Sequence, residues 1–185
     1  MSEPARTLHH WTRAEYDRMV ETDVFQPEAR LELLDGEIIE MSPQKSLHAT
    51  AVSLITEALR DGFGTGFSIR GQMPLLLDDY SEPEPDVAVV KGNIRDYTDR
   101  HPSTAVLLVE VADSTLAYDR LNKAAAYARN AIPEHWVLNL RDRCLEVHRG
   151  PDHGVYTERA LLTAGETVSP LGAPELRIEI AALLP

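Results

Sequence analysis

Two carboxylates in the middle of the chain occupy positions where a charge is costly. Asp86 follows Pro85 at the start of a short apolar run, residues 87–90, and Glu110 lies inside a second apolar run, residues 106–111. An ionised carboxylate among apolar neighbours is strongly destabilising unless a partner compensates its charge. One interpretation is structural, with Glu110 in a buried ion pair with an arginine. The other is that the two carboxylates act together.

The pairing of Asp86 and Glu110 has a chemical consequence. The two residues lie in successive predicted strands, joined by a segment long enough to return the chain to a neighbouring strand. Two such charges about 4 Å apart repel by about 4 kcal/mol at an effective dielectric constant of 20, and a divalent cation removes that conflict. Mg²⁺ binds through one or two carboxylates and keeps its remaining waters for a substrate. The pair therefore predicts a Mg²⁺ or Mn²⁺ site suited to phosphodiester hydrolysis.

Lys123 is the third candidate. It lies four residues after Asp119 and four before Tyr127, so all three share one face of a helix predicted over residues 119–130. A solvated ion pair between Lys123 and Asp119, which stabilises a helix only slightly, is the simplest interpretation. The neighbouring alanines at 124–126 also let this helix lie close to the sheet, where an ammonium could stabilise a transition state. Spacing alone leaves both interpretations open.

The elements that must position these residues follow from apolar periodicity and from turn residues. Thr12 and Glu15 have the spacing of a capping box, which predicts a helix to about residue 21. Asp35 and Gly36 predict the two-residue turn of a hairpin over residues 30–41. Apolar residues at helical spacing predict a second helix over residues 46–60, ended by the glycines at 62, 64 and 66.

The second half of the chain is dominated by extended segments. They are predicted over residues 67–77, 87–90, 105–111, 134–140, 144–149, 155–162 and 176–180. The segments 134–140 and 144–149 form a hairpin that turns at residues 141–142. Unbroken apolar runs suit strands that are covered on both faces of a sheet. The sequence therefore predicts one α/β domain over residues 1–185, in which residues 1–10 are flexible.

Composition limits the class of protein. The chain has 185 residues, 43% of them hydrophobic, and a formal net charge of −12. Its single cysteine, Cys144, excludes an internal disulfide framework and a cysteine-rich metal site. No apolar run approaches the ~18 residues of a membrane span, and the N-terminus lacks the apolar core of a secretory signal. We therefore expect a cytoplasmic protein without membrane contact.

The acidic charge also bears on partners. It disfavours tight, non-specific binding to nucleic acid, unless positive side chains gather on one face. The arginines that could build such a face are Arg120, Arg129, Arg141, Arg143 and Arg149.

Several motifs appear in an order that is characteristic of one family. They comprise residues 31–37, Ser42-Pro43 and His48, residues 82–87, residues 109–115, Asp119 with Lys123 and Tyr127, and residues 132–136. Over residues 10–183 this order resembles the Uma-type restriction endonuclease family, formerly a domain of unknown function, in the PD-(D/E)XK nuclease superfamily. The resemblance implies a restriction-endonuclease-like α/β fold. In that fold a mixed central β-sheet is flanked by helices, with β-hairpins at its N-terminal and C-terminal ends.

The resemblance also assigns roles. It matches Asp86 to the aspartate of the PD motif and Glu110 to the second metal carboxylate. The lysine position of the motif holds Ala112, and in this family the lysine function moves to the following helix, which makes Lys123 the candidate. Glu32 and His48 match further family positions, close to the metal or to the attacking water.

Three more residues match family positions without a catalytic assignment: Ser114, Asp119 and Tyr127. Their expected role is to hold the helix against the strand.

The sequence thus predicts a Mg²⁺- or Mn²⁺-dependent endonuclease that hydrolyses nucleic acid. DNA is the first expected substrate, and a homodimer is one candidate assembly. The alternative is a catalytically inactive module of the same fold that binds or regulates. Ala112 and the charge of −12 favour the inactive module, whereas Asp86, Glu110 and Lys123 favour the enzyme.

Overall fold

The computed structural model describes residues 7–26 and 28–185. Its helical segments are α1 (Arg13–Glu21), α2 (Ser46–Phe63), the 3₁₀ turn η1 (Ile94–Tyr97), α3 (Leu116–Tyr118), the π-helical turn η2 (Asp119–Lys123), α4 (Ala124–Arg129) and α5 (Ile180–Leu183). Its strands are β1 (Leu31–Leu34), β2 (Glu37–Glu40), β3 (Phe67–Gly71), β4 (Val87–Lys91), β5 (Leu107–Ala112), β6 (Glu134–Asn139), β7 (Cys144–Asp152), β8 (Val155–Thr163), β9 (Thr167–Val168) and β10 (Ile178–Glu179). Within the same ranges, no helix combines the length and the apolar character needed to cross a membrane.

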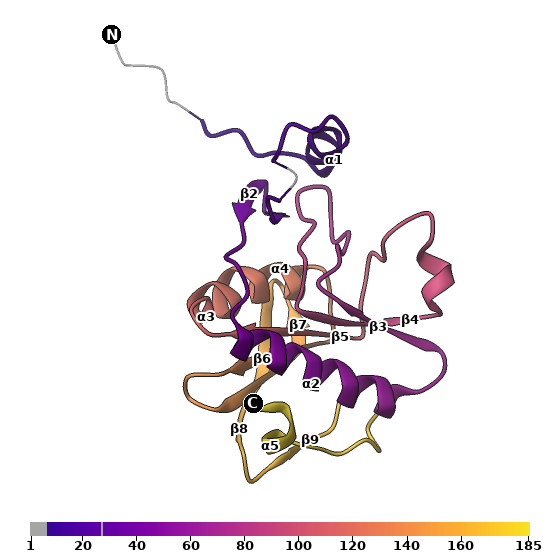
Figure 1. The fold of residues 1–185 in the computed structure, drawn as a ribbon, viewed down its shortest axis with the longest axis vertical. Coiled ribbons are helices and arrows are strands. Elements are labelled where there is room, and N and C mark those ends of the chain that lie inside the picture. Colours follow the sequence, from indigo (N-terminus) through magenta and orange to yellow (C-terminus); the bar gives the residue numbers. More distant parts are fainter. Residues whose placement is uncertain (1–6, 27) are drawn as a thin grey trace.

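A six-stranded sheet in the order β3-β4-β5-β6-β7-β8 forms the centre of the molecule. Every neighbouring pair is antiparallel except β5 and β6, which run parallel. The connection between those two strands is the helical segment α3-η2-α4. Figure 1 shows α2 on one side of the sheet and α3 and α4 on the other. The predicted α/β fold, with a mixed central sheet flanked by helices, is confirmed.

Each face of the sheet carries its own apolar core. Ile55 and Leu59 of α2 pack with Val109 of β5 on one face. Tyr127 of α4 packs with Leu108 of β5 on the other. Because successive side chains of a strand point to opposite faces, a strand covered on both sides must be apolar throughout. This explains why β4 and β5 read as unbroken apolar runs, and it makes Glu110 exceptional.

The N-terminal hairpin turns where the sequence predicts. Asp35 and Gly36 have φ angles of 52° and 80°, which match a primed turn, and β1 pairs with β2 from Leu34 opposite Glu37. Residues 1–6 of the segment expected to be flexible lie outside the described residues. His10, the last residue of the segment 1–10, packs over Gly36. The Nδ1 atom of His10 lies 2.9 Å from the carbonyl oxygen of Asp35.

Two predicted boundaries differ from the structure. The predicted strand over residues 67–77 pairs only as far as Gly71, because Gln72 adopts a φ of 51° and turns the chain out of the sheet. The helix predicted to end at residue 60 continues to Phe63 and includes Gly62. A Cβ atom on Gly62 would lie 2.2 Å from Leu176 Cδ2, so this glycine serves close packing rather than helix termination.

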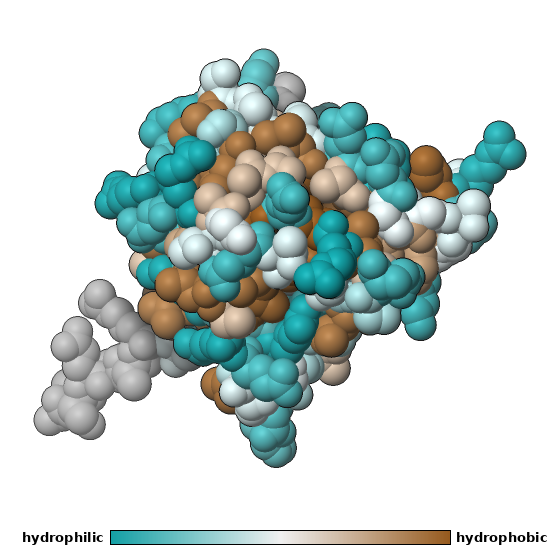
Figure 2. Space-filling view, turned by 90° about the horizontal axis from the view of Figure 1, so that it is seen from below, coloured by the Kyte–Doolittle hydropathy of each residue, from teal (hydrophilic) through white to brown (hydrophobic). Residues whose placement is uncertain are grey.

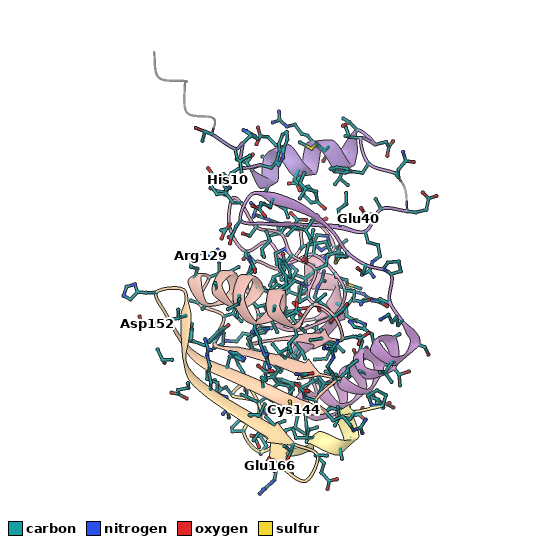
Figure 3. The ribbon with its side chains drawn as sticks, turned by 90° about the vertical axis from the view of Figure 1, so that its left-hand side faces the viewer. His10, Glu40, Arg129, Cys144, Asp152 and Glu166 are labelled. Atoms are coloured by element: carbon teal, nitrogen blue, oxygen red, sulfur yellow. The ribbon has the colours of Figure 1, made fainter. Side chains whose placement is uncertain are left out.

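The C-terminal region contains the predicted hairpin β6–β7 and a longer hairpin, β7–β8, with Asp152 near its tip (Figure 3). The predicted strand over residues 176–180 is shorter, because Ile180 already begins α5. The face of the molecule seen in Figure 2 has hydrophobic side chains gathered near its middle, with hydrophilic ones around them.

A buried carboxylate fastens the segment after β8 to the sheet. Glu134 is fully buried, and its Oε1 accepts hydrogen bonds from Trp136 Nε1 (2.9 Å) and from Arg149 Nε (2.8 Å). Its Oε2 accepts the backbone N–H of Leu171 at 2.7 Å. Glu134 therefore belongs to the framework and not to the candidate site.

Candidate active site

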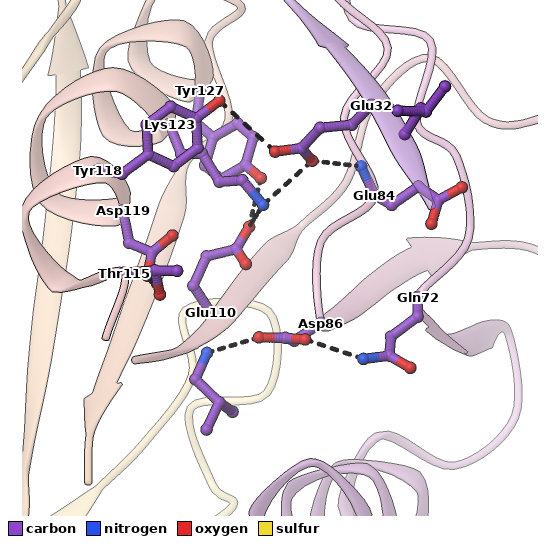
Figure 4. Close-up of polar contacts among 12 residues, drawn as sticks. Glu32, Gln72, Glu84, Asp86, Glu110, Thr115, Tyr118, Asp119, Lys123 and Tyr127 are labelled. Atoms are coloured by element: carbon purple, nitrogen blue, oxygen red, sulfur yellow. Dashed lines mark hydrogen bonds and ion pairs between the residues drawn. The ribbon is translucent and has the colours of Figure 1, made fainter. Parts of the chain in front are cut away.

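A cavity of about 450 Å³ opens where the N-terminal hairpin, the first turn of α2, the end of β5 and the helical segment α3-η2 meet. All five predicted site residues line it: Glu32, His48, Asp86, Glu110 and Lys123. Ser114 and Asp119 line it as well, whereas Tyr127 lies behind the cavity wall in the core. Figure 4 shows polar contacts of Glu32, Asp86, Glu110 and Lys123.

Strand register brings the two central carboxylates together. In the antiparallel pair β4–β5, Val87 lies opposite Val109, so one further step along the register places Asp86 opposite Glu110. The Asp86 carboxylate also accepts the backbone N–H of Val111, the residue after Glu110, at 2.8 Å.

Asp86 is held by two further donors from separate segments. Gln72 Nε2 donates to Oδ1 at 3.0 Å, and His48 Nε2, from the first turn of α2, lies 3.1 Å from Oδ2. Burial favours a higher pKa for Asp86, but the hydrogen bonds from His48, Val111 and Gln72 hold the pKa of this carboxyl below its ordinary value. The hydrogen bond to Asp86 raises the pKa of His48. Asp86 is thus ionised and fixed in orientation.

Glu32 reaches the cavity because the hairpin is bonded to the segment before β4. Leu33 and Glu82 exchange backbone hydrogen bonds of 3.3 and 2.7 Å, which aligns β1 beside residues 82–85. The N–H of Glu84 then donates to Glu32 Oε2 at 3.1 Å, and Tyr118 Oη lies 3.5 Å from Glu32 Oε1. The bridge between two segments 50 residues apart could not be deduced from the sequence.

Lys123 points into this group of carboxylates and not into solvent. Its side chain is 6% exposed, and Nζ lies 3.2 Å from Glu32 Oε2 and 3.2 Å from Glu110 Oε1. Burial lowers the pKa of Lys123, but the charges of Glu110 and Glu32 outweigh burial and raise it above its ordinary value. Lys123 is therefore a charged ammonium shared between two carboxylates.

The solvated ion pair between Lys123 and Asp119 does not form. Asp119 Oδ2 instead accepts the hydroxyl of Thr115 at 2.6 Å, and burial raises the pKa of Asp119 to about 6. The cause is the π-helical turn η2, in which the N–H of Ala124 bonds to the carbonyl of Asp119. A turn of five residues changes which side chains share a face, so Lys123 and Asp119 are not superposed as they would be in an α-helix.

Glu110 has one occupied oxygen and one open oxygen. Its Oε1 accepts the hydroxyl of Tyr127 at 2.5 Å as well as the contact with Lys123. Among the described residues no donor is hydrogen-bonded to Oε2, although Glu110 lines the cavity. Burial raises the pKa of Glu110 well above its ordinary value, and Lys123 offsets this only in part. On the side of the cavity, the Glu110 carboxylate therefore lacks a positively charged partner within the described part of the chain.

The donor set fits a hard divalent cation. Three buried carboxylates, Glu32, Glu110 and Asp119, face one buried ammonium, and half-buried Asp86 adds a further negative charge. Oxygen ligands of this kind suit Mg²⁺ and Mn²⁺. Within residues 7–26 and 28–185, no group of three or more His, Cys, Asp and Glu side chains is arranged to hold a metal ion. A cation here would thus depend on two carboxylates and on water, which is a usual mode for Mg²⁺.

The basic face considered from the sequence is largely neutralised. Arg120 pairs with Glu146, and Arg149 pairs with Glu134. Arg129, at the end of α4 (Figure 3), pairs with Asp35. Three of the five arginines therefore have carboxylate partners within the chain.

Comparisons with known proteins bear on the family and on the fold. A family model described as "Uma2: Putative restriction endonuclease" matches residues 13–181, which confirms the resemblance inferred from the motifs. A crystal structure described as "a putative nuclease belonging to DUF820", from Anabaena variabilis, has a TM-score of 0.69 at 15% sequence identity. The match covers 88% of this chain and 94% of that chain, and at this identity it shows the fold alone. No curated protein matches the chain significantly.

Proposed function

This chain belongs to the Uma2 restriction endonuclease family, and we propose that it is a divalent-metal-dependent nuclease in which Asp86 and Glu110 hold the metal. The observation that carries the proposal is the open Oε2 of Glu110. This oxygen accepts no hydrogen bond within the described residues and Glu110 lines the cavity, so a cation bound there would lower the cost of ionising a carboxylate that is only 2% exposed. Asp86, fixed by three donors beside it, supplies the second ligand.

The chain's own residues supply the rest of the machinery. A divalent cation bound here would neutralise charge on a phosphate and lower the pKa of a bound water. Lys123 provides a fixed, charged donor where negative charge develops in the transition state. Glu32 holds the Lys123 ammonium from the opposite side, so Glu32 positions the lysine. His48 in the same way positions Asp86.

Nucleic acid, with DNA first, is the proposed substrate. The family description and the nuclease described from Anabaena variabilis support it. The net charge of −12 opposes binding of a polyanion, so the substrate must bind locally and with the help of the cation. Affinity without divalent metal should therefore be poor and should improve sharply when metal is added.

Calorimetric titration with Mn²⁺ and with Mg²⁺ tests the metal site. We expect saturable binding to the wild-type protein and its loss in Glu110→Gln and Asp86→Asn. Asp113→Asn is the matched control, because Asp113 lines the same cavity but pairs with the exposed Lys45 at its rim. Equal weakening in all three variants would show that the cavity attracts cations only by its general negative charge, and would refute the assignment.

A plasmid-nicking assay separates the enzyme from the inactive module. Nicking by the wild-type protein with Mn²⁺, and none by Lys123→Met under conditions in which that variant is folded and still binds Mn²⁺, is the expected result. Metal binding without nicking of any nucleic acid would favour the inactive module, as the alanine at position 112 does.

A further inference from the structure

A second cavity, of about 520 Å³, lies at the far end of the same two strands. Its wall includes Lys91 at the end of β4 and residues 100–106, which lead into β5. Asp86 precedes β4 and Lys91 ends it, so the two cavities are separated by the length of a five-residue strand, about 16 Å. This second cavity therefore shares no residue with the candidate active site.

A largely buried arginine, Arg70, stands behind its wall. Arg70 of β3 is 8% exposed, and among the described residues no carboxylate lies within ion-pair distance of it. Its partners are neutral: Nη2 bonds to His101 Nδ1 at 2.9 Å, and the guanidinium lies 5.4 Å from the ring centre of Tyr97. Both His101 and Tyr97 line the cavity. Arg70 is thus a largely buried arginine without an anionic partner in the described residues, and an anion bound nearby would stabilise its charge.

The contact with Arg70 also fixes the chemistry of His101. A guanidinium only donates hydrogen bonds, so Nδ1 of His101 must accept, and the proton of the neutral ring is then on Nε2. Burial and the charge of Arg70 lower the pKa of His101, in keeping with a neutral ring. The exposed His101 thus offers a donor oriented by a residue behind it.

The remaining polar groups of the cavity are mostly cationic or hydroxyl-bearing. Lys91 and Arg100 are exposed, and within the described residues neither has a carboxylate in ion-pair distance; Ser103 and Thr104 add hydroxyls. The acidic residue in the lining, Asp96, uses its Oδ2 to accept the N–H of Asn93. In a chain of charge −12, this is a local concentration of anion-binding groups.

We infer that this cavity is a phosphate-binding site, in which Lys91, Arg100 and the Nε2 of His101 contact the anion and Arg70 orients His101. The ligand class is a phosphate group, carried either by a free nucleotide or by the backbone of a nucleic acid. This phosphate site is independent of the metal site. The two cavities share no lining residue, and the charge of the phosphate would be balanced by the side chains of Lys91 and Arg100 without a metal ion.

Titration of the metal-free protein in EDTA with inorganic phosphate, at constant ionic strength, tests the inference. The readout is the NMR signal of the His101 ring. We expect a saturable shift whose apparent Kd rises roughly tenfold in Arg100→Ala, as the loss of one charge-assisted hydrogen bond implies. Arg95→Ala is the matched control, because Arg95 lies in η1, carries the same exposed charge and is outside the cavity lining.

A shift that does not saturate, or an equal loss of affinity in Arg95→Ala, would overturn the site. His101→Phe, which keeps an aromatic ring beside Arg70 but has no donor, should weaken phosphate binding measured by calorimetry. Unchanged affinity in this variant would likewise count against the phosphate site.

Two further titrations identify the source of the phosphate. Tighter binding of adenosine monophosphate than of a short single-stranded oligonucleotide, per phosphate group, would assign the cavity to a free nucleotide. The reverse order would assign it to a nucleic-acid backbone. Neither readout involves cleavage or metal, so failure here is distinct from failure of the proposed nuclease.

Discussion

Replacing Lys123 by methionine removes the ammonium that Glu32 and Glu110 share and keeps most of the side-chain volume. Each of the two contacts is 3.2 Å long, which corresponds to about 5 kcal/mol of attraction at an effective dielectric constant of 20. Much of that gross energy offsets the desolvation of three buried charges. Removing one partner from a buried ion pair typically costs about 3–5 kcal/mol, and we expect Lys123→Met to lower the free energy of unfolding by that amount at pH 7.

Urea unfolding followed by circular dichroism measures this loss, and a second substitution tests its cause. If the damage comes from carboxylates left without a partner, Glu32→Gln in the Lys123→Met background should recover part of the stability. The same change in the wild-type protein should lower it, because there it removes a partner of Lys123. A double-mutant cycle expresses the difference as one coupling energy.

Lys45→Met provides the matched control at the rim of the same cavity. Lys45 also contacts a carboxylate, Asp113, but its side chain is 73% exposed, and exposed pairs contribute little. A loss in Lys123→Met no larger than that in Lys45→Met, or no recovery on adding Glu32→Gln, would refute the arrangement of charges described for the site.

Other predictions concern stability outside the site. Burial raises the pKa of Glu82 to about 7 from 4.5, so the folded state holds a proton that the unfolded state has lost. The free energy of unfolding should therefore fall as pH rises from 4.5 to 7, by about 3 kcal/mol from this group; Glu82→Gln should flatten that slope in urea titrations. Glu134→Ala should lower the free energy of unfolding by about 3–5 kcal/mol, measured in the same way, because it leaves Arg149 without its buried partner. Gly36→Ala should lower the melting temperature, since a Cβ there would lie 2.6 Å from His10 Cβ at a φ of 80°. An unchanged value in any of these measurements would contradict the corresponding contact.

Local signals in the sequence predicted those elements whose causes are local. The capping box of Thr12 and Glu15 forms as expected, and the turn at Asp35 and Gly36 forms because its backbone requirement is met by those two residues. The boundaries that differ depend on distant partners. Gly62 reads as a helix terminator until Leu176 is known to occupy the space beside it.

The candidate site likewise combines features that are visible in the local sequence with features that depend on distant residues. Asp86 and Glu110 were recognisable because a carboxylate beside or inside an apolar run is unusual wherever it occurs. Their alignment depends on an antiparallel register between β4 and β5, which no local pattern specifies. Tyr118 and Gln72 were not predicted as site residues, since neither stands out in sequence. Tyr118 reaches Glu32 only after the hairpin has bonded to the segment at residue 82.

The position of Lys123 follows from a constraint on β5. Ala112 lies two residues after Glu110 and therefore on the same face of the strand, but it is 1% exposed. A lysine stem at position 112 would have to displace packed neighbours, and overpacking of this kind is destabilising. The helix that crosses from β5 to β6 passes over that face, and its π-helical turn ends at Lys123. From there the ammonium lies 3.2 Å from Glu110 Oε1 and 3.2 Å from Glu32 Oε2. The lysine supplied by the helix is thus held between a carboxylate of the central sheet and a carboxylate of the N-terminal hairpin.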